Sequence, residues 1–123
     1  MSRNREKRAG ELVRQEIANL LTSGLKDPRI GFVSVMHVRM SADLRYANVY
    51  VSLLGDERAR TSSLVALRNS AGWLRGQIGR RLRMRYAPEI RFFEDTSVDE
   101  AFRLEEIFRE IHSEEEDQEN AGD

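Results

Sequence analysis

The sequence predicts an α+β domain in which helices pack on one face of a three-stranded sheet. Segments 9–22 and 62–87 carry apolar residues three and four positions apart, which is typical of amphipathic helices. Segments 30–40 and 45–54 are rich in β-forming residues and joined so closely that they form an antiparallel hairpin. With a strand after Pro88 and a last helix, the expected order is helix, strand, strand, helix, kink, helix, strand, helix.

The N-terminal region divides into a basic lead-in, residues 1–8, and an amphipathic helix that runs from Ala9 to about Thr22. The lead-in is either a second arm that contacts phosphate or a frayed tail. Gly24 is the expected C-cap of the helix, and Asp27-Pro28-Arg29 has the composition of a turn.

The predicted hairpin has a mostly buried first strand. In its first strand Phe32, Met36 and Val38 share one phase with Ile30 and Met40, while Val33 and Val35 lie on the other. The second strand directs four apolar residues inward: Ala47, Val49, Val51 and Leu53. Residues 55–61 are expected to form a solvated loop.

The helical region before Pro88 is predicted to begin with Ser62 or Ser63 as its N-cap and to end at the proline. Ser70-Ala71-Gly72 places three small residues in the middle of the pattern, which predicts a kink or a break between two helices. The apolar stripe on either side consists of Leu64, Leu67, Ala71, Leu74, Ile78 and Leu82.

The C-terminal region is predicted to form an amphipathic helix from Ser97 to about Ile111, with Ala101, Leu104 and Phe108 on the same side as Ile111. Residues 113–123 have no apolar content on which to fold and are expected to be a disordered acidic tail. This tail either keeps the chain soluble or folds back over basic residues and competes with phosphate for them.

Charge is divided unevenly along the chain. Residues 1–91 contain 18 of the 20 Lys and Arg residues and 8 of the 21 Asp and Glu residues, a net charge of +10. Residues 92–123 carry a net charge of −11. The basic part predicts an anionic partner, although the pI of the whole chain is about 6.2.

Five segments carry a family resemblance: 27–33, 41–51, 71–75, 79–86 and 88–92, which read DPRIGFV, SADLRYANVYV, AGWLR, GRRLRMRY and PEIRF. They lie between about Arg8 and Phe108. Together with the order of elements, they make the chain similar to KH domains of type II and, more specifically, to the ribosome-binding factor A family. The resemblance implies a KH-like RNA-binding domain over residues 9–112.

The resemblance also implies a function. A member of this family is expected to bind the small (30S) ribosomal subunit and 16S rRNA and to assist late maturation, including processing of the 5′ end of 16S rRNA. The family replaces the G-x-x-G loop of KH domains by an Ala-x-Gly kink, and Ser70-Ala71-Gly72 here departs from it in its first residue. Residues 76–79, Gly-Gln-Ile-Gly, are a literal G-x-x-G, but Ile78 keeps the apolar register and is expected in the core.

The candidate RNA-binding residues are the kink and the basic residues near it. Arginine suits phosphate because its planar guanidinium group donates two parallel hydrogen bonds. The alternative is an ordinary solvated helix face. The candidates are Ser70, Ala71, Gly72, Arg68, Arg75, Arg80, Arg81, Arg83, Arg85, Arg45 and Arg8, with Trp73, Tyr46, Tyr50 and Tyr86 as candidates for base stacking.

Other classes of function have little support. The chain has no cysteine, its two histidines His37 and His112 are far apart, and no nucleophile elbow, Walker loop or paired carboxylates appear. We therefore expect no catalytic residue, metal, cofactor, membrane partner or small-molecule substrate, and a monomer in the cytoplasm. The competing hypotheses are a generic single-stranded RNA chaperone and a protein-interaction adaptor.

Overall fold

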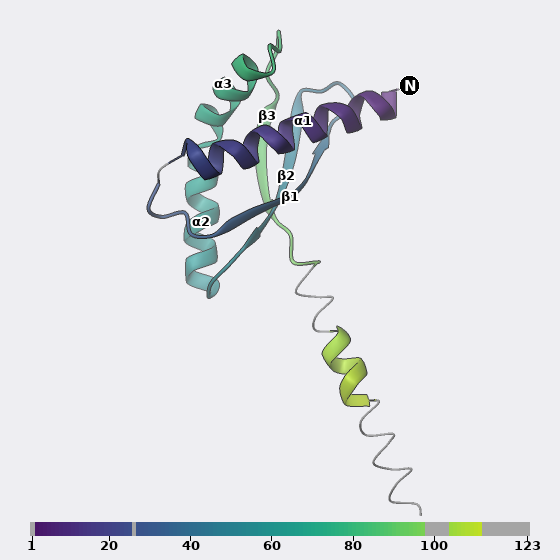
Figure 1. Cartoon of the computed structure of the whole chain (residues 1–123), viewed down its shortest axis with the longest axis vertical. Coiled ribbons are helices and arrows are strands. Elements are labelled where there is room, and N and C mark those ends of the chain that lie inside the picture. Colours follow the sequence, from purple (N-terminus) through teal and green to yellow (C-terminus); the bar gives the residue numbers. More distant parts are fainter. Residues whose placement is uncertain (1, 26, 98–103, 112–123) are drawn as a thin grey trace, which may run out of the picture.

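The computed structural model describes residues 2–25, 27–97 and 104–111. Its elements follow the order α1 (Ser2–Ser23), β1 (Val33–Met40), β2 (Tyr46–Leu53), α2 (Glu57–Asn69), α3 (Ala71–Arg81) and β3 (Glu89–Glu94) (Figure 1). Residues 104–111 are also helical and lie apart from the other elements (Figure 1). No described helix has the length and apolar content needed to span a membrane.

The three strands form one sheet in the order β1-β2-β3. β1 and β2 are antiparallel, and β3 returns parallel to β2 after the α2–α3 crossover. α1 packs on β1, and α2 and α3 pack on β3, so the three helices cover one face of the sheet. The predicted α+β architecture is confirmed. Its core consists of Val13, Ile17, Leu20, Met40, Ala47, Val49, Val51, Leu53, Leu67, Leu74, Ile78, Ile90 and Phe92.

α1 begins earlier than the apolar pattern predicts. Residues 2–8, expected as a lead-in before the helix, form its first two turns. Arg, Glu and Lys have high helix propensity, so this part of the helix needs no apolar stripe of its own. α1 crosses the sheet closely at Gly10, where an added Cβ would lie 2.8 Å from the carbonyl oxygen of Val38. The helix therefore carries Arg5 and Arg8 beside the domain.

β1 does not have the predicted phase. A bulge between Val35 and His37 shifts its pairing with β2, so Val35 and Val38 both face the core side. Phe32 and Met36, expected to belong to a mostly buried strand, are 71% and 37% exposed. A run of apolar residues fits either phase, and only the pairing of the hairpin selects one.

α2 begins at Glu57, so the expected loop over residues 55–61 is only partly a loop and the predicted serine cap is wrong. Asp56 is the N-cap, and its side chain accepts a hydrogen bond from Ala59 N at 2.8 Å. Ser63 is instead 2% exposed, and its hydroxyl accepts a hydrogen bond from Gly31 N at 3.1 Å. The first turns of α2 are exposed, which is why the apolar stripe misses them.

α3 ends at Arg81, seven residues before Pro88. Leu82 is its C-cap, and Arg83 adopts a positive φ of 52°. Arg83 and Arg85, predicted on the helix, therefore lie in the connection between α3 and β3. The predicted strand after Pro88 is confirmed as β3.

The structure tests only part of the C-terminal predictions. Residues 104–111 are helical as expected, but Leu104, Phe108 and Ile111 are exposed and contact no core. Ala101 and the predicted acidic tail, residues 113–123, lie outside the described residues.

Candidate nucleic-acid interface

The predicted break at Ser70-Ala71-Gly72 is present. α2 ends at Asn69 and α3 begins at Ala71, with Ser70 shared between them at φ −90° and ψ −3°. The Ser70 hydroxyl donates back to the carbonyl oxygen of Ala66 at 2.9 Å, and no side-chain cap bond is made to α3. The first backbone amides of α3 are therefore not capped by this side chain, and such amides attract anions.

Gly72 lies on the open side of this break. It is exposed, and a Cβ added there would meet nothing within 4 Å. Packing within the domain therefore does not require glycine at this position. The alternative Gly76–Gly79 motif lies inside α3, where Ile78 is fully buried as predicted.

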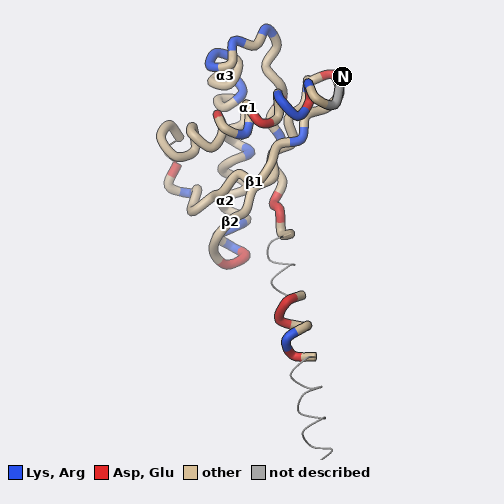
Figure 2. The backbone as a smooth tube through the Cα atoms, turned by 45° about the vertical axis from the view of Figure 1, so that its right-hand side comes forward, with Lys and Arg blue, Asp and Glu red and all other residues tan. Residues whose placement is uncertain are grey.

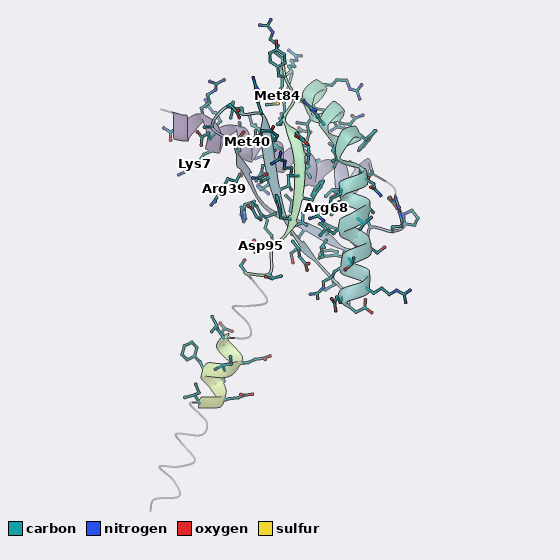
Figure 3. The ribbon with its side chains drawn as sticks, turned by 180° about the vertical axis from the view of Figure 1, so that it is seen from behind. Lys7, Arg39, Met40, Arg68, Met84 and Asp95 are labelled. Atoms are coloured by element: carbon teal, nitrogen blue, oxygen red, sulfur yellow. The ribbon has the colours of Figure 1, made fainter. Side chains whose placement is uncertain are left out.

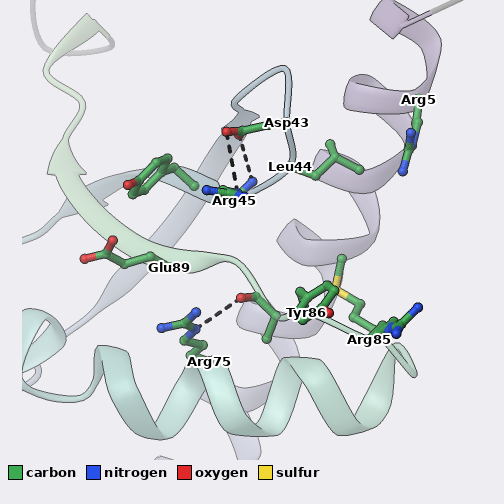
Figure 4. Close-up of a pocket in the computed structure, with 11 residues that line it drawn as sticks. Arg5, Asp43, Leu44, Arg45, Arg75, Arg85, Tyr86 and Glu89 are labelled. Atoms are coloured by element: carbon green, nitrogen blue, oxygen red, sulfur yellow. Dashed lines mark hydrogen bonds and ion pairs between the residues drawn. The ribbon is translucent and has the colours of Figure 1, made fainter.

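A second feature is a surface cleft of about 720 Å³, which we call the basic cleft (Figure 4). Three separate parts of the chain enclose it: the start of α1, the β1–β2 turn, and α3 with the α3–β3 connection that follows it. Its lining residues are Arg5, Asp43, Leu44, Arg45, Tyr46, Arg75, Met84, Arg85, Tyr86, Ala87 and Glu89. Four guanidinium groups and two carboxylates give the lining a net positive charge of two.

Local bonds hold the walls of the basic cleft. Asp43 accepts hydrogen bonds from the Ser41 hydroxyl at 2.6 Å and from Arg45 N at 3.1 Å, as a turn-capping residue does. Both hydrogen bonds lower the pKa of Asp43, and the bond from the Ser41 hydroxyl has the larger effect. Across the cleft, Arg75 Nε donates to the carbonyl oxygen of Ala87 at 3.1 Å. Arg75 therefore fixes the α3–β3 connection, which carries Arg85.

Two tyrosines add flat surfaces beside the arginines. Tyr86 is 77% exposed, with the Arg85 guanidinium carbon 5.5 Å from its ring centroid. Tyr46 is half-buried, and Arg91 lies 4.1 Å over its ring. Arginine next to an exposed aromatic ring is the combination with which proteins bind single-stranded nucleic acid.

The structure brings only part of the predicted site together. Arg45, Arg75 and Arg85 meet in the basic cleft, whereas the other predicted arginines lie outside it. Arg68 donates to the carbonyl oxygen of Phe92 at 3.0 and 3.3 Å, and Arg81 lies 3.5 Å from a Glu16 carboxylate oxygen. Arg8, Arg80 and Arg83 are exposed. Figure 2 shows basic positions gathered around the end of α3 and the connection after it.

The stacking candidates also separate. Trp73 is 42% exposed and packs near Gly24, where an added Cβ would lie 3.4 Å from its ring. Tyr50 lies on β2, stacked between His37 and Phe93 and away from the cleft lining. Tyr46 and Tyr86 are thus the two candidates that share a surface with the arginines.

Arg5 of the lining belongs to the basic lead-in, for which the sequence leaves open a phosphate-contacting arm or a frayed tail, and it is not among the candidate RNA-binding residues named above. It reaches the cleft because α1 begins at Ser2, which the apolar pattern does not predict.

Metal binding has no support in the described part of the chain, where no group of three or more His, Cys, Asp or Glu residues is placed to hold an ion.

Comparisons with known proteins agree with the fold. The sequence profile of the ribosome-binding factor A family matches residues 5–108. The chain is 46% identical over 116 residues to ribosome-binding factor A of Desulfitobacterium hafniense, covering 94% of this chain and 93% of that protein.

Two solved structures are also similar. The crystal structure of ribosome-binding factor A from Thermus thermophilus has a TM-score of 0.64 at 28% identity, and the match covers 72% of this chain and 94% of that one. A homology model of the Thermus thermophilus protein, fitted into a cryo-EM map of its complex with 30S, has a TM-score of 0.60 at 29% identity, with 71% and 91% covered. The chain belongs to the ribosome-binding factor A family.

Proposed function

We propose that this chain binds the small (30S) ribosomal subunit by contacting 16S rRNA, and that it assists late maturation, including processing of the 5′ end of 16S rRNA. Family membership and the fitted complex of a relative with 30S support the choice of partner. The observation that carries the proposal for this chain is the convergence of Arg5, Arg45, Arg75 and Arg85 with two tyrosines in one cleft.

The proposed interface has two parts. The basic cleft holds backbone phosphates through its arginines, while Tyr86 stacks on an unpaired base. The kink offers the uncapped amides of α3 and the open surface at Gly72 to a further phosphate. Arg8, Arg80, Arg81 and Arg83 extend the positive field around both parts.

The mechanism follows from binding alone. A rigid surface that fits one conformation of the rRNA stabilises that conformation relative to its competitors, by the difference in binding free energy. No residue is assigned a chemical step, and the chain acts as a cytoplasmic monomer in this proposal.

Co-sedimentation with 30S, 50S and 70S particles across a salt series tests the proposal. We expect selective binding to 30S, with a log–log salt slope of roughly 0.7 to 0.9 per phosphate contact. Equal binding to every RNA would instead indicate a generic RNA chaperone. Binding that does not depend on salt or RNA would indicate a protein-interaction adaptor.

A matched pair of variants tests the basic cleft. Arg45→Ala/Arg85→Ala removes two cleft arginines, and Arg29→Ala/Arg58→Ala removes the same charge from exposed positions outside the cleft lining. We expect the cleft pair to weaken 30S binding and to reduce the salt slope by about the value of two contacts, while the control pair leaves the slope unchanged. Equal effects of the two pairs would show that only net charge matters.

The maturation role has its own test. Cells that depend on the Arg45→Ala/Arg85→Ala chain should accumulate 16S precursor with an unprocessed 5′ end, measured by primer extension. The control pair should restore processing. If cells with the cleft pair process the 5′ end normally although 30S binding is weakened, maturation does not depend on this interface.

A further inference from the structure

The face of the sheet opposite the helices is apolar along one row. His37, Tyr50 and Phe93 are partners across β1, β2 and β3, and their rings stack side by side. The ring centroids are 4.4 Å apart for His37 and Tyr50 and 5.5 Å apart for Tyr50 and Phe93, with interplanar angles of 17° and 28°. We call these three residues the aromatic row; Figure 3 views the sheet from this side, opposite α1.

The aromatic row is open in the described structure. Phe93 is 39% exposed, and the His37 side chain is 52% exposed. Met36, at the bulge of β1, is 37% exposed. Two arginines, Arg39 and Arg91, occupy the next row of this face, since both are partners of Asn48. The face thus combines an apolar ridge with a positive border on one side of it.

Residues 104–111 form a second uncovered apolar surface. Leu104, Ile107, Phe108 and Ile111 are 55%, 45%, 68% and 47% exposed and follow the spacing of one helix face. Glu105 and Glu110 border this face in the helical arrangement. Most helical stability in proteins comes from packing an amphipathic face, so this helix gains its stability only when the face is covered.

We propose that the apolar face of helix 104–111 docks on the aromatic row of the same chain. The sizes agree, because eight helical residues are about 12 Å long and three strands span about 10 Å. Charge agrees on one side of the row, where Arg39 and Arg91 lie together and face one of the two acidic residues that border the helix face, Glu105 or Glu110.

The path of the chain supports the same occupant. After β3, Asp95 N donates to the carbonyl oxygen of Val51 at 2.7 Å, and the Asp95 carboxylate lies 3.7 Å from Nδ1 of His37. The chain therefore leaves β3 next to the aromatic row. Nine residues separate Glu94 from Leu104, and such a length reaches up to about 30 Å.

The orientation of the rings favours a helix over nucleic acid. Stacked rings on neighbouring strands turn their faces toward one another, so Tyr50 has no free face for a base. Base binding on a sheet requires such free faces. Ring edges instead suit contact with leucine, isoleucine and phenylalanine side chains. This inference does not depend on the proposed ribosomal function.

Paramagnetic relaxation enhancement measured by NMR tests the docking on the full chain. The sequence has no cysteine, so Arg109→Cys introduces a single site for a nitroxide label on the helix side away from the apolar face. We expect the label to broaden the amide signals of His37, Tyr50 and Phe93. Adding Phe108→Asp should abolish this broadening, whereas Val65→Asp, an exposed apolar position on α2, should leave it unchanged.

Controls identify the source of the effect. A nitroxide at Ser62→Cys on α2 should broaden amides of that helix and spare the aromatic row. If the label at Arg109→Cys leaves the amide signals of the aromatic row unchanged, the proposal is overturned. Broadening in unlabelled ¹⁵N chain mixed with labelled ¹⁴N chain would assign the face to a second copy. If single-stranded RNA shifts the amide signals of the aromatic row, and shifts them equally in the Phe108→Asp variant, the face would be assigned to nucleic acid. Binding of a second copy and binding of RNA would each overturn the proposal.

Discussion

The guanidinium group of Arg68 on α2 donates two hydrogen bonds, at 3.0 and 3.3 Å, to the backbone carbonyl oxygen of Phe92 on β3. β3 pairs with β2 along one edge only, so this carbonyl lies on the outer edge of the sheet. Arg75 makes the same type of contact with Ala87, just before β3. Two arginines predicted to contact RNA therefore also join the helices to the strand.

Arg68→Ala is expected to lower the free energy of unfolding by about 1–2 kcal/mol, because a partly buried carbonyl loses a charged donor. Urea denaturation measures the change. Arg80→Ala removes an exposed arginine of α3 and should stay within about 0.5 kcal/mol of the parent chain. Equal stability of the two variants would contradict a structural role for Arg68.

Gly10→Ala is expected to destabilise the domain by about 1–3 kcal/mol, because its Cβ would lie 2.8 Å from the Val38 carbonyl oxygen and α1 would have to move off β1. Thermal unfolding followed by circular dichroism measures the effect. Gly76→Ala is the matched control, since its Cβ would come no closer than 3.9 Å to Arg80 Nη2. That change should be neutral or stabilise the helix by up to about 1 kcal/mol.

Gly72→Ala is expected to leave the free energy of unfolding within about 0.5 kcal/mol, because the added Cβ meets nothing within 4 Å. If the kink contacts RNA as proposed, the same variant should bind 30S particles several-fold more weakly in co-sedimentation. Binding equal to that of the parent chain would remove Gly72 from the interface while leaving the basic cleft in place.

Asp43→Asn is expected to reduce the dependence of stability on acid pH. Hydrogen bonds from the Ser41 hydroxyl and Arg45 N lower the pKa of Asp43 in the folded chain. The contribution of Asp43 to the free energy of unfolding is therefore present above the unfolded pKa of about 3.9, and it is lost as the pH falls through the lower pKa of the folded chain. Urea denaturation should show a larger deficit of the variant at about pH 7 than at about pH 3. The same deficit at both pH values would contradict this assignment.

The sequence predicts those features that depend on neighbouring residues. The hairpin and the break at Ser70-Ala71-Gly72 follow from short-range spacing and small residues, and both are present. The phase of β1 does not follow in this way, because the bulge at His37 depends on pairing with β2. The start of α2 is missed because its first turns face solvent, so that Asp56 rather than an apolar stripe marks it.

The basic cleft is less predictable than the fold. Arg5, Arg45 and Arg85 come from three separate parts of the chain, and only the packing of α1 and the α3–β3 connection against the β1–β2 turn brings them together. The cluster of arginines in sequence includes Arg85 of the cleft lining, but also Arg80, Arg81 and Arg83, which lie outside it. Charge clustering in sequence thus finds one wall of the basic cleft and does not show which distant residues join it.

The bulge in β1 also bears on self-association through the edge of the sheet. β1 is an edge strand, and a long regular edge is a template for pairing with strands of other molecules. The extra residue between Val35 and His37 breaks the regular spacing of hydrogen-bonding groups along that edge. A chain in which the bulge is removed by deleting Met36 would present an uninterrupted edge, and we expect it to aggregate more readily during folding at high concentration.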